Sequence, residues 1–115
     1  MNAPTVEELT LLHSHLCQAL GETKRIEILY ALYERPRHVS ALAEDLGYPQ
    51  PTISRHLKVL KQCTLVSAER DGASVIYQIT DERIIEILND MRNLLRDVIE
   101  RQNRVLASEP ANMEA

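Results

Sequence analysis

The sequence predicts a mainly helical domain that carries a helix-turn-helix and a two-stranded β-hairpin. Apolar residues recur at helical spacing along most of the chain, a glycine separates two short helical segments in its middle, and an Asp-Gly pair stands between two β-rich runs. With 115 residues, of which 44% are hydrophobic, there is room for one core, so we expect residues 1–115 to form a single domain. That core must be aliphatic, because the chain has no Phe or Trp and only four Tyr.

Two helices are expected in the first third of the chain. The first spans residues 6–20, where leucine and valine recur at spacings of three and four until Gly21 supplies a stop. The second opens at Glu22 and ends before Arg35, because the following Pro36 disfavours helical backbone in the residue that precedes it.

A helix-turn-helix is predicted over residues 39–61. Its first helix has barely two turns and closes at Gly47, and its second helix presents Ile53, Leu57 and Leu60 as an apolar face. In such motifs the second helix usually enters the major groove of DNA.

An extended pattern follows over residues 65–79. The pair Asp71-Gly72 stands between two β-rich runs, and both central positions of a type I′ turn need a positive φ, so we expect these two residues at the centre of a tight hairpin. A hairpin directly behind a helix-turn-helix is a wing. The predicted fold is therefore a winged helix-turn-helix with five helices and a two-stranded wing.

The last helix is expected over residues 80–106, with Thr80 as its cap and residues 107–115 as a flexible tail. Its apolar stripe is too long for one small core, so we expect it to pair with a second copy of the chain, together with the first helix. The expected dimer interface consists of Leu9, Leu12, Leu16, Leu88, Met91, Leu95 and Ile99.

Positive charge is concentrated in the middle of an acidic chain. The net charge is −4, yet residues 48–78 carry four basic side chains against two acidic ones. This distribution favours contact with DNA phosphates in that segment. It argues against the rival interpretation, a winged-helix protein-interaction module that does not bind DNA. We expect no enzyme, because the sequence has no phosphate-binding loop or nucleophile motif.

The location of the protein is indicated by what the sequence lacks. The longest charge-free apolar run, residues 28–33, is far shorter than the roughly 20 residues of a membrane helix, and residues 1–8 show no export signal. We therefore expect a soluble cytoplasmic protein without a membrane partner. Cys17 and Cys63 have no metal-finger spacing, so free thiols are expected.

Two strings of the sequence match a known family. Residues 19–29 read ALGETKRIEIL, which is similar to the family's opening ALGDPTRLRIL, and residues 50–60 read QPTISRHLKVL, which resembles its recognition-helix signature. From about Leu16 to Ile79 the chain thus resembles the ArsR/SmtB family of small dimeric winged-helix repressors. The resemblance implies a homodimeric transcriptional repressor that binds an inverted-repeat operator in double-stranded DNA and is released by an unidentified signal.

The chain departs from the family pattern at both ends of the recognition helix. Pro49 replaces the serine that usually caps the helix, so we expect a start without a side-chain cap. Thr64 stands where a glycine usually follows, so we expect a strained or displaced end.

The expected DNA contacts lie on the recognition helix and the wing. Arg55 lies almost opposite the apolar face, where it can read a guanine, contact a phosphate or remain in solvent. His56 flanks the apolar face, where a structural hydrogen bond is the alternative to DNA contact, and Arg25 is expected in an internal ion pair. The expected DNA-binding residues are Gln50, Thr52, Ser54, Arg55, His56, Lys58, Lys61, Arg70 and Ser74.

The metal sites known in the family are not matched. Its zinc-ligand positions on the last helix read Asp81, Arg83, Leu94 and Asp97, and its thiolate positions read His38, Ser40 and Ala43. The remaining sensing candidates are Cys17, Cys63 and His13, through a thiophilic metal or metalloid or through thiol oxidation. The alternative is that both cysteines only pack in the fold, and no other cofactor or metal is expected.

Overall fold

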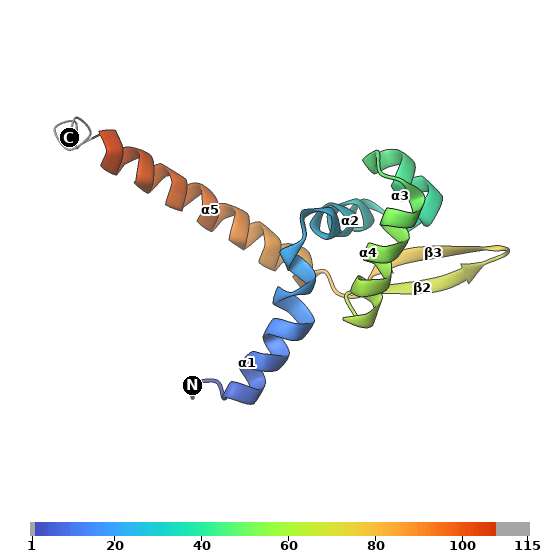
Figure 1. Cartoon of the computed structure of the whole chain (residues 1–115), viewed down its shortest axis with the longest axis horizontal. Helices are drawn as coiled ribbons and strands as arrows, with labels where there is room; N and C mark the ends of the chain where they lie inside the picture. The colour runs from blue at the N-terminus through green and yellow to red at the C-terminus, as the bar shows by residue number, and fades with distance from the viewer. Residues whose placement is uncertain (1, 108–115) are drawn as a thin grey trace. The chain divides into compact units, whose positions relative to one another are not determined.

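A computed structural model of the chain describes residues 2–107, and its elements follow the predicted order (Figure 1). The prediction of a mainly helical winged helix-turn-helix is confirmed. Where the sequence predicts one domain, the contacts divide the chain into two compact units, Met1–Glu82 and Arg83–Ala115. The expected flexible tail lies outside the described residues, apart from Ala107.

The first helical segment has three parts where the sequence predicts one regular helix. Helix α1 (Val6–Leu12) is capped by Thr5, whose Oγ1 accepts a hydrogen bond from a backbone N–H of the first turn. A π-helical turn, η1 (His13–Cys17), and a 3₁₀ turn, η2 (Ala19–Gly21), follow. The N–H of Gln18 donates to the His13 carbonyl at 2.7 Å, and this five-residue step widens the helix. The segment ends at Gly21, as predicted.

Three helices build the core of the first unit. Helix α2 (Thr23–Glu34) ends before Pro36, and α3 (Val39–Leu46) ends at Gly47, whose φ is +76°, as the sequence predicts. Helix α4 (Gln50–Gln62) completes the helix-turn-helix. The largest fully buried side chains of these helices are Ile28, Leu29, Leu32, Leu42, Ile53, Leu57 and Leu60.

The sheet has three strands where the sequence predicts two. Strands β2 (Val66–Asp71) and β3 (Ser74–Ile79) form the antiparallel wing, and β1 (Arg37–His38) pairs with the other side of β3. A strand of two residues is too short for its sequence pattern to be recognised. It matters for the fold because it attaches the wing to the start of α3.

The turn of the wing differs by one position from the prediction. The register pairs Asp71 with Ser74, so the two central residues are Gly72 and Ala73. Gly72 has a φ of +64°, whereas the φ of Ala73 is not positive. A glycine at the first central position is the pattern of a type II′ turn, so the predicted type I′ turn centred on Asp71 and Gly72 is wrong.

Thr64 ends α4 in a strained conformation, as its departure from the family pattern predicts. Its φ is +60°, and it is the only residue other than glycine with a positive φ among residues 2–107. The Leu65 N–H donates to the Leu60 carbonyl at 2.9 Å and the Thr64 N–H to the Lys61 carbonyl at 3.0 Å, which together make a Schellman motif. The Thr80 hydroxyl donates to the Thr64 carbonyl at 2.7 Å, so Thr80 holds this turn and does not cap the last helix.

Helix α5 (Arg83–Ala107) forms the second unit and begins three residues later than predicted. Its first apolar residues, Ile84, Ile85 and Leu88, are buried in the single chain, and the assignment of Leu88 to the dimer interface stays a prediction. The stripe beyond Leu88 is exposed, and its large apolar residues are Met91, Leu94, Leu95, Val98, Ile99, Val105 and Leu106.

We predict that Thr64→Gly stabilises the protein. A β-branched side chain at a φ of +60° is strained, and glycine removes that strain at a cost in unfolded-chain entropy, so the expected gain is about 1 kcal/mol in the free energy of unfolding. Urea unfolding measures it. Gly47→Ala is the matched control, because it places a side chain at a φ of +76° and should lower stability by a similar amount. A Thr64→Gly variant less stable than the wild type contradicts the prediction.

Candidate nucleic-acid interface

Helix α4 has one fully buried face and one exposed face. Ile53, Leu57 and Leu60 have 0% exposure, which confirms the predicted apolar face. Because side chains advance by about 100° per residue, this packing turns Arg55 outward. The exposed expected contact residues of the helix are Gln50, Ser54, Arg55, Lys58 and Lys61, whereas Thr52 and His56 are half-buried.

The start of α4 carries the positive end of the helix dipole without a side-chain cap. Pro49 precedes the helix with no side-chain cap, as the sequence predicts, and Pro51 has no N–H of its own. The Pro49 carbonyl accepts from the N–H groups of Thr52 and Ile53, at 3.0 and 3.2 Å. The positive end of the helix dipole therefore lies beside exposed Gln50, which is a favourable place for a phosphate oxygen.

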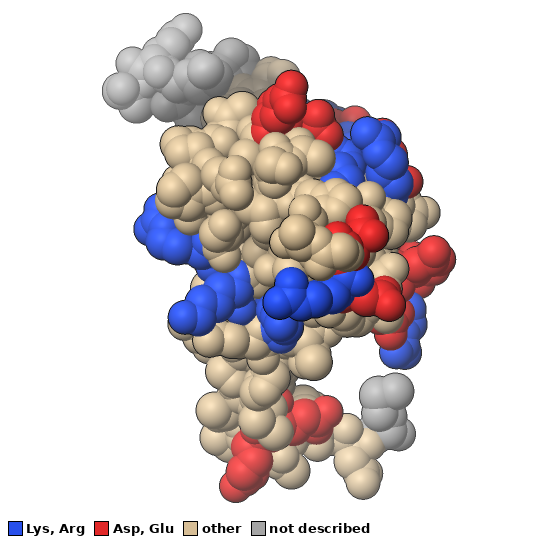
Figure 2. Space-filling model, turned by 90° about the vertical axis from the view of Figure 1, so that its right-hand side faces the viewer, with Lys and Arg blue, Asp and Glu red and all other residues tan. Residues whose placement is uncertain are grey.

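The cations of this face have no acidic partner within the described part of the chain. None of Arg55, Lys58, Lys61 and Arg70 forms an ion pair there, whereas Lys24, Arg35, Arg37 and Arg104 do. Figure 2 shows the side of the molecule that bears α4 and the wing, with Lys and Arg side chains across its middle and acidic side chains both beside them and towards its edges. The face therefore combines exposure with uncompensated positive charge.

A small hollow joins the wing to the helix-turn-helix. It encloses about 260 Å³, and it brings together Gln50 and Ser74, two of the expected DNA contacts from different elements. His38, Ser40 and Tyr77 also line it, and the sequence pattern does not single them out for this face, because strand β1, which places His38, is too short to be recognised. His38 Nε2 lies 3.1 Å from an Asp71 carboxylate oxygen, so the wing tip is tied to the start of α3.

His56 makes a structural contact with Arg25. The Nη1 of Arg25 lies 3.3 Å from His56 Nδ1, and the same guanidinium donates to the carbonyls of Ala19 and Gln18. The internal ion pair expected for Arg25 is therefore wrong, because its partners are carbonyl oxygens and a ring nitrogen. Partial burial and then the charge of Arg25 lower the pKa of His56 below its usual range.

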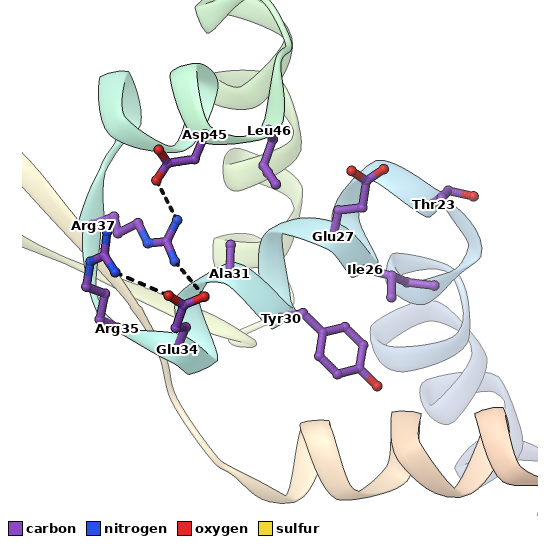
Figure 3. A pocket seen from close by; sticks show the side chains of 10 residues that line it. All are labelled: Thr23, Ile26, Glu27, Tyr30, Ala31, Glu34, Arg35, Arg37, Asp45 and Leu46. Atoms are coloured by element: carbon purple, nitrogen blue, oxygen red, sulfur yellow. Dashed lines mark hydrogen bonds and ion pairs between the residues drawn. The ribbon is translucent and has the colours of Figure 1, made fainter.

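A larger hollow, of about 650 Å³, lies between α2 and α3 (Figure 3). The guanidinium of Arg37 reaches into it from β1, 2.6 Å from Asp45 and 3.3 Å from Glu34, and Arg35 joins the same Glu34. Glu27 accepts a hydrogen bond from Tyr48 at 2.7 Å, which raises the pKa of that phenol. Because Arg35 and Arg37 pair with Glu34 and Asp45, we interpret the hollow as a structural cluster, although the buried Nε of Arg37 has no hydrogen-bond partner among the described residues. Its lining residues are Thr23, Ile26, Glu27, Tyr30, Ala31, Glu34, Arg35, Arg37, Asp45 and Leu46.

The sensing candidates do not form a metal centre. Cys17 is exposed in the π-helical turn, Cys63 is half-buried after α4, and both are free thiols. Among residues 2–107, no three side chains of His, Cys, Asp or Glu converge as metal ligands. Regulation through Cys17, Cys63 and His13 stays a prediction.

Over residues 2–107, no helix combines the length and apolar character that crossing a membrane requires.

If a thiol carries the regulation, Cys17→Ser with Cys63→Ser should leave DNA affinity unchanged and remove its response to oxidant, polysulfide or a thiophilic metal, because the thiolate is the reacting group. Electrophoretic mobility shifts with and without each reagent measure this. The single variants identify the responding cysteine. A wild type that ignores all three reagents, or a double variant that still responds, assigns both cysteines to packing.

Comparisons with known proteins identify the group to which this geometry belongs. The sequence model described as "Bacterial regulatory protein, arsR family" matches residues 22–68. The HTH-type transcriptional repressor SmtB of Mycobacterium tuberculosis is 38% identical over 88 residues, which make up 76% of this chain. The match covers 65% of that repressor, so the chain spans just under two thirds of this relative.

Two solved structures have the same fold. Rv0081 of Mycobacterium tuberculosis, an HTH-type transcriptional regulator, is 36% identical over 87% of this chain and 89% of its own length. Its crystal structure superposes with a TM-score of 0.72, covering 82% of this chain and 95% of that one. Mb0332 of Mycobacterium bovis, described as a homodimeric winged helix-turn-helix DNA-binding domain, has a TM-score of 0.71 at 27% identity and covers 88% and 95% of the two chains.

Proposed function

The chain belongs to the ArsR family of bacterial regulatory proteins, and we propose that it is a sequence-specific DNA-binding transcriptional repressor that acts as a homodimer. The observation that carries the proposal is the exposed face of α4, where Arg55, Lys58 and Lys61 have no acidic partner among the described residues. The relative SmtB is named as a repressor, which supports the same direction of regulation. Such a protein works in the cytoplasm, beside the chromosome, and we propose no enzymatic activity for it.

In this proposal the basic residues of α4 have different tasks. Arg55 points away from the core, and its guanidinium can donate two parallel hydrogen bonds to the O6 and N7 atoms of a guanine in the major groove. Lys58 and Lys61 lie further along the same face, where an ammonium group attracts phosphates without reading sequence. Arg70, near the tip of the wing, contacts the minor groove or the backbone beside it.

The dimer follows from the exposed stripe of α5. Met91, Leu95 and Ile99 are between 44% and 57% exposed, and a row of such residues on one helix face is what a second copy can bury. Leu9, Leu12 and Leu16 remain candidates for the same interface. Mb0332 is described as homodimeric, which supports this assembly. Two copies related by a two-fold axis would place two α4 helices on an inverted repeat.

Selection of bound sequences from a random DNA pool should return an inverted repeat with half-sites about 10–10.5 bp apart, one helical turn. On that operator, Arg55→Ala should lose about 1–3 kcal/mol of discrimination at one base pair per half-site. Lys61→Ala is the matched control. It should weaken binding to all sequences alike and reduce the slope of log affinity against log salt by about 0.9 for each phosphate that the variant no longer neutralises.

Two results would contradict this proposal. A pool without enrichment favours the rival function, a protein-interaction module. Equal losses on operator and random DNA for Arg55→Ala make Arg55 a phosphate contact.

Leu95→Asp should convert the dimer to monomers, because it places a charge in an apolar interface. Operator affinity should then fall on the order of 10²-fold, since the two half-sites are no longer bound together. Sedimentation at micromolar concentration and operator titration measure the two effects. Asn93→Asp, which adds the same charge to the opposite face of α5, should change neither. A wild-type protein that sediments as a monomer contradicts the dimer.

A further inference from the structure

One side chain connects three elements of the first unit. Arg25 stands in the first turn of α2, and its Nε donates to the Ala19 carbonyl at 2.6 Å while its Nη2 donates to the Gln18 carbonyl at 3.0 Å. Its third nitrogen, Nη1, reaches His56 Nδ1 on α4 at 3.3 Å. Because a guanidinium is planar and rigid, these three bonds fix one relative position of the three partners.

The carbonyl partners lie at the end of the first helical segment. The last carbonyls of a helix lack intrahelical donors, and Gln18 and Ala19 lie where the π-helical turn passes into the 3₁₀ turn. Arg25 donates to both carbonyls, and the Gln18 carbonyl also accepts from the Gly21 N–H at 3.3 Å. The end of this segment, which carries the dimer candidates Leu12 and Leu16, is thereby linked to α4.

The α4 partner of Arg25 controls the direction of the DNA-facing residues. His56 is half-buried and stands between Arg55, which is exposed, and Leu57, which has 0% exposure. A side chain at this border of the helix resists rotation of α4 about its axis. A small rotation of α4 would move Arg55 relative to a base edge while the domain stays folded.

We propose that Arg25 is a positioning residue that holds the recognition helix in register through neutral His56, and that protonation of His56 releases it and weakens operator binding. The proposal rests on the proposed function, because it assigns a regulation to the same DNA-binding face. It also predicts a measurable property of the protein without DNA.

The chemistry of the contact makes it sensitive to protons. A guanidinium can only donate, so His56 Nδ1 must accept, and the ring proton must sit on Nε2. Adding a proton to Nδ1 leaves two donors facing each other at 3.3 Å, each with a positive charge. The other charged groups around His56 are the cations Lys24 and Arg55 and the anion Glu22, whose charge favours protonation and is outweighed.

The proposal predicts a sign opposite to that of simple electrostatics. If His56 only contacted phosphate, protonation would add a positive charge to the DNA-facing helix and strengthen binding as the pH falls. If Arg25 positions α4 through His56, binding weakens as the pH falls. The direction of the change therefore distinguishes the two roles.

The experiment measures operator affinity from pH 7.5 to pH 5.5 at fixed ionic strength, with the sequence selected from the random pool. Wild-type affinity should fall several-fold on acidification. His56→Asn keeps an acceptor oxygen near the Nδ1 position and cannot titrate, so its affinity should follow a flatter pH profile. Arg25→Lys keeps the charge but replaces three nitrogens held in one plane by a single ammonium nitrogen on a flexible chain, and it should bind weakly already at pH 7.5. Circular dichroism confirms that each variant is folded.

A second readout does not need DNA. Because the pKa of His56 is lowered in the folded protein, the unfolded chain takes up the proton more readily, and stability is lost as the pH falls below about 6.5. Urea unfolding should show a larger loss for the wild type than for His56→Asn. This difference in stability between the wild type and His56→Asn can be measured even if the pool selection finds no operator. Failure of the proposed function and failure of the Arg25 contact are therefore distinguishable.

Two outcomes of the pH experiment, and one of the Arg25→Lys measurement, would overturn the proposal. One is operator affinity that rises on acidification in the wild type, which makes His56 a phosphate contact. The other is the same pH profile in the wild type and His56→Asn, which removes His56 from the pH response. Arg25→Lys with wild-type operator affinity at pH 7.5 would equally show that Arg25 does not position α4.

Discussion

The packing of three side chains of α4 into the core determines how the rest of the molecule works. Ile53, Leu57 and Leu60 are completely buried, and their spacing leaves the helix one rotation at which all three fit. That rotation points Arg55 outward. Helices α2 and α3 supply the apolar surface that receives these residues, so the same burial that stabilises the domain presents its charged face.

The features that could be predicted from the sequence are those with a local cause. Gly47 ends α3 because its backbone is left-handed, Pro36 limits α2, and the apolar period of α4 identifies its buried side. The features that could not be predicted depend on distant partners. Strand β1 exists because Arg37 and His38 pair with Tyr77 and Ile76, and nothing in two residues indicates that pairing.

The errors in the wing and at its junctions have the same origin. The centre of the turn lies one residue later than predicted, because strand pairing, and not the Asp-Gly dipeptide alone, determines which residues lie there. Thr80 is a good helix cap in isolation, but its hydroxyl finds the carbonyl of Thr64, sixteen residues earlier. Arg25 was expected to pair with an acid, whereas it donates to two carbonyls at a helix end. Local preference gives way wherever a tertiary partner satisfies a polar group better.

Two properties of the chain look unfavourable for a DNA-binding monomer, and each has its own resolution. The net charge of −4 opposes contact with DNA, but acids such as Glu34 and Asp45 are engaged by arginines at the hollow between α2 and α3, away from the unpaired cations of α4. A helix as long as α5 with its apolar stripe exposed gains little from packing and exposes an aggregation-prone surface. Burial of that stripe against a second copy would remove both disadvantages. It would also bring two cationic faces onto one DNA, so that the attraction of each to phosphate adds to that of the other.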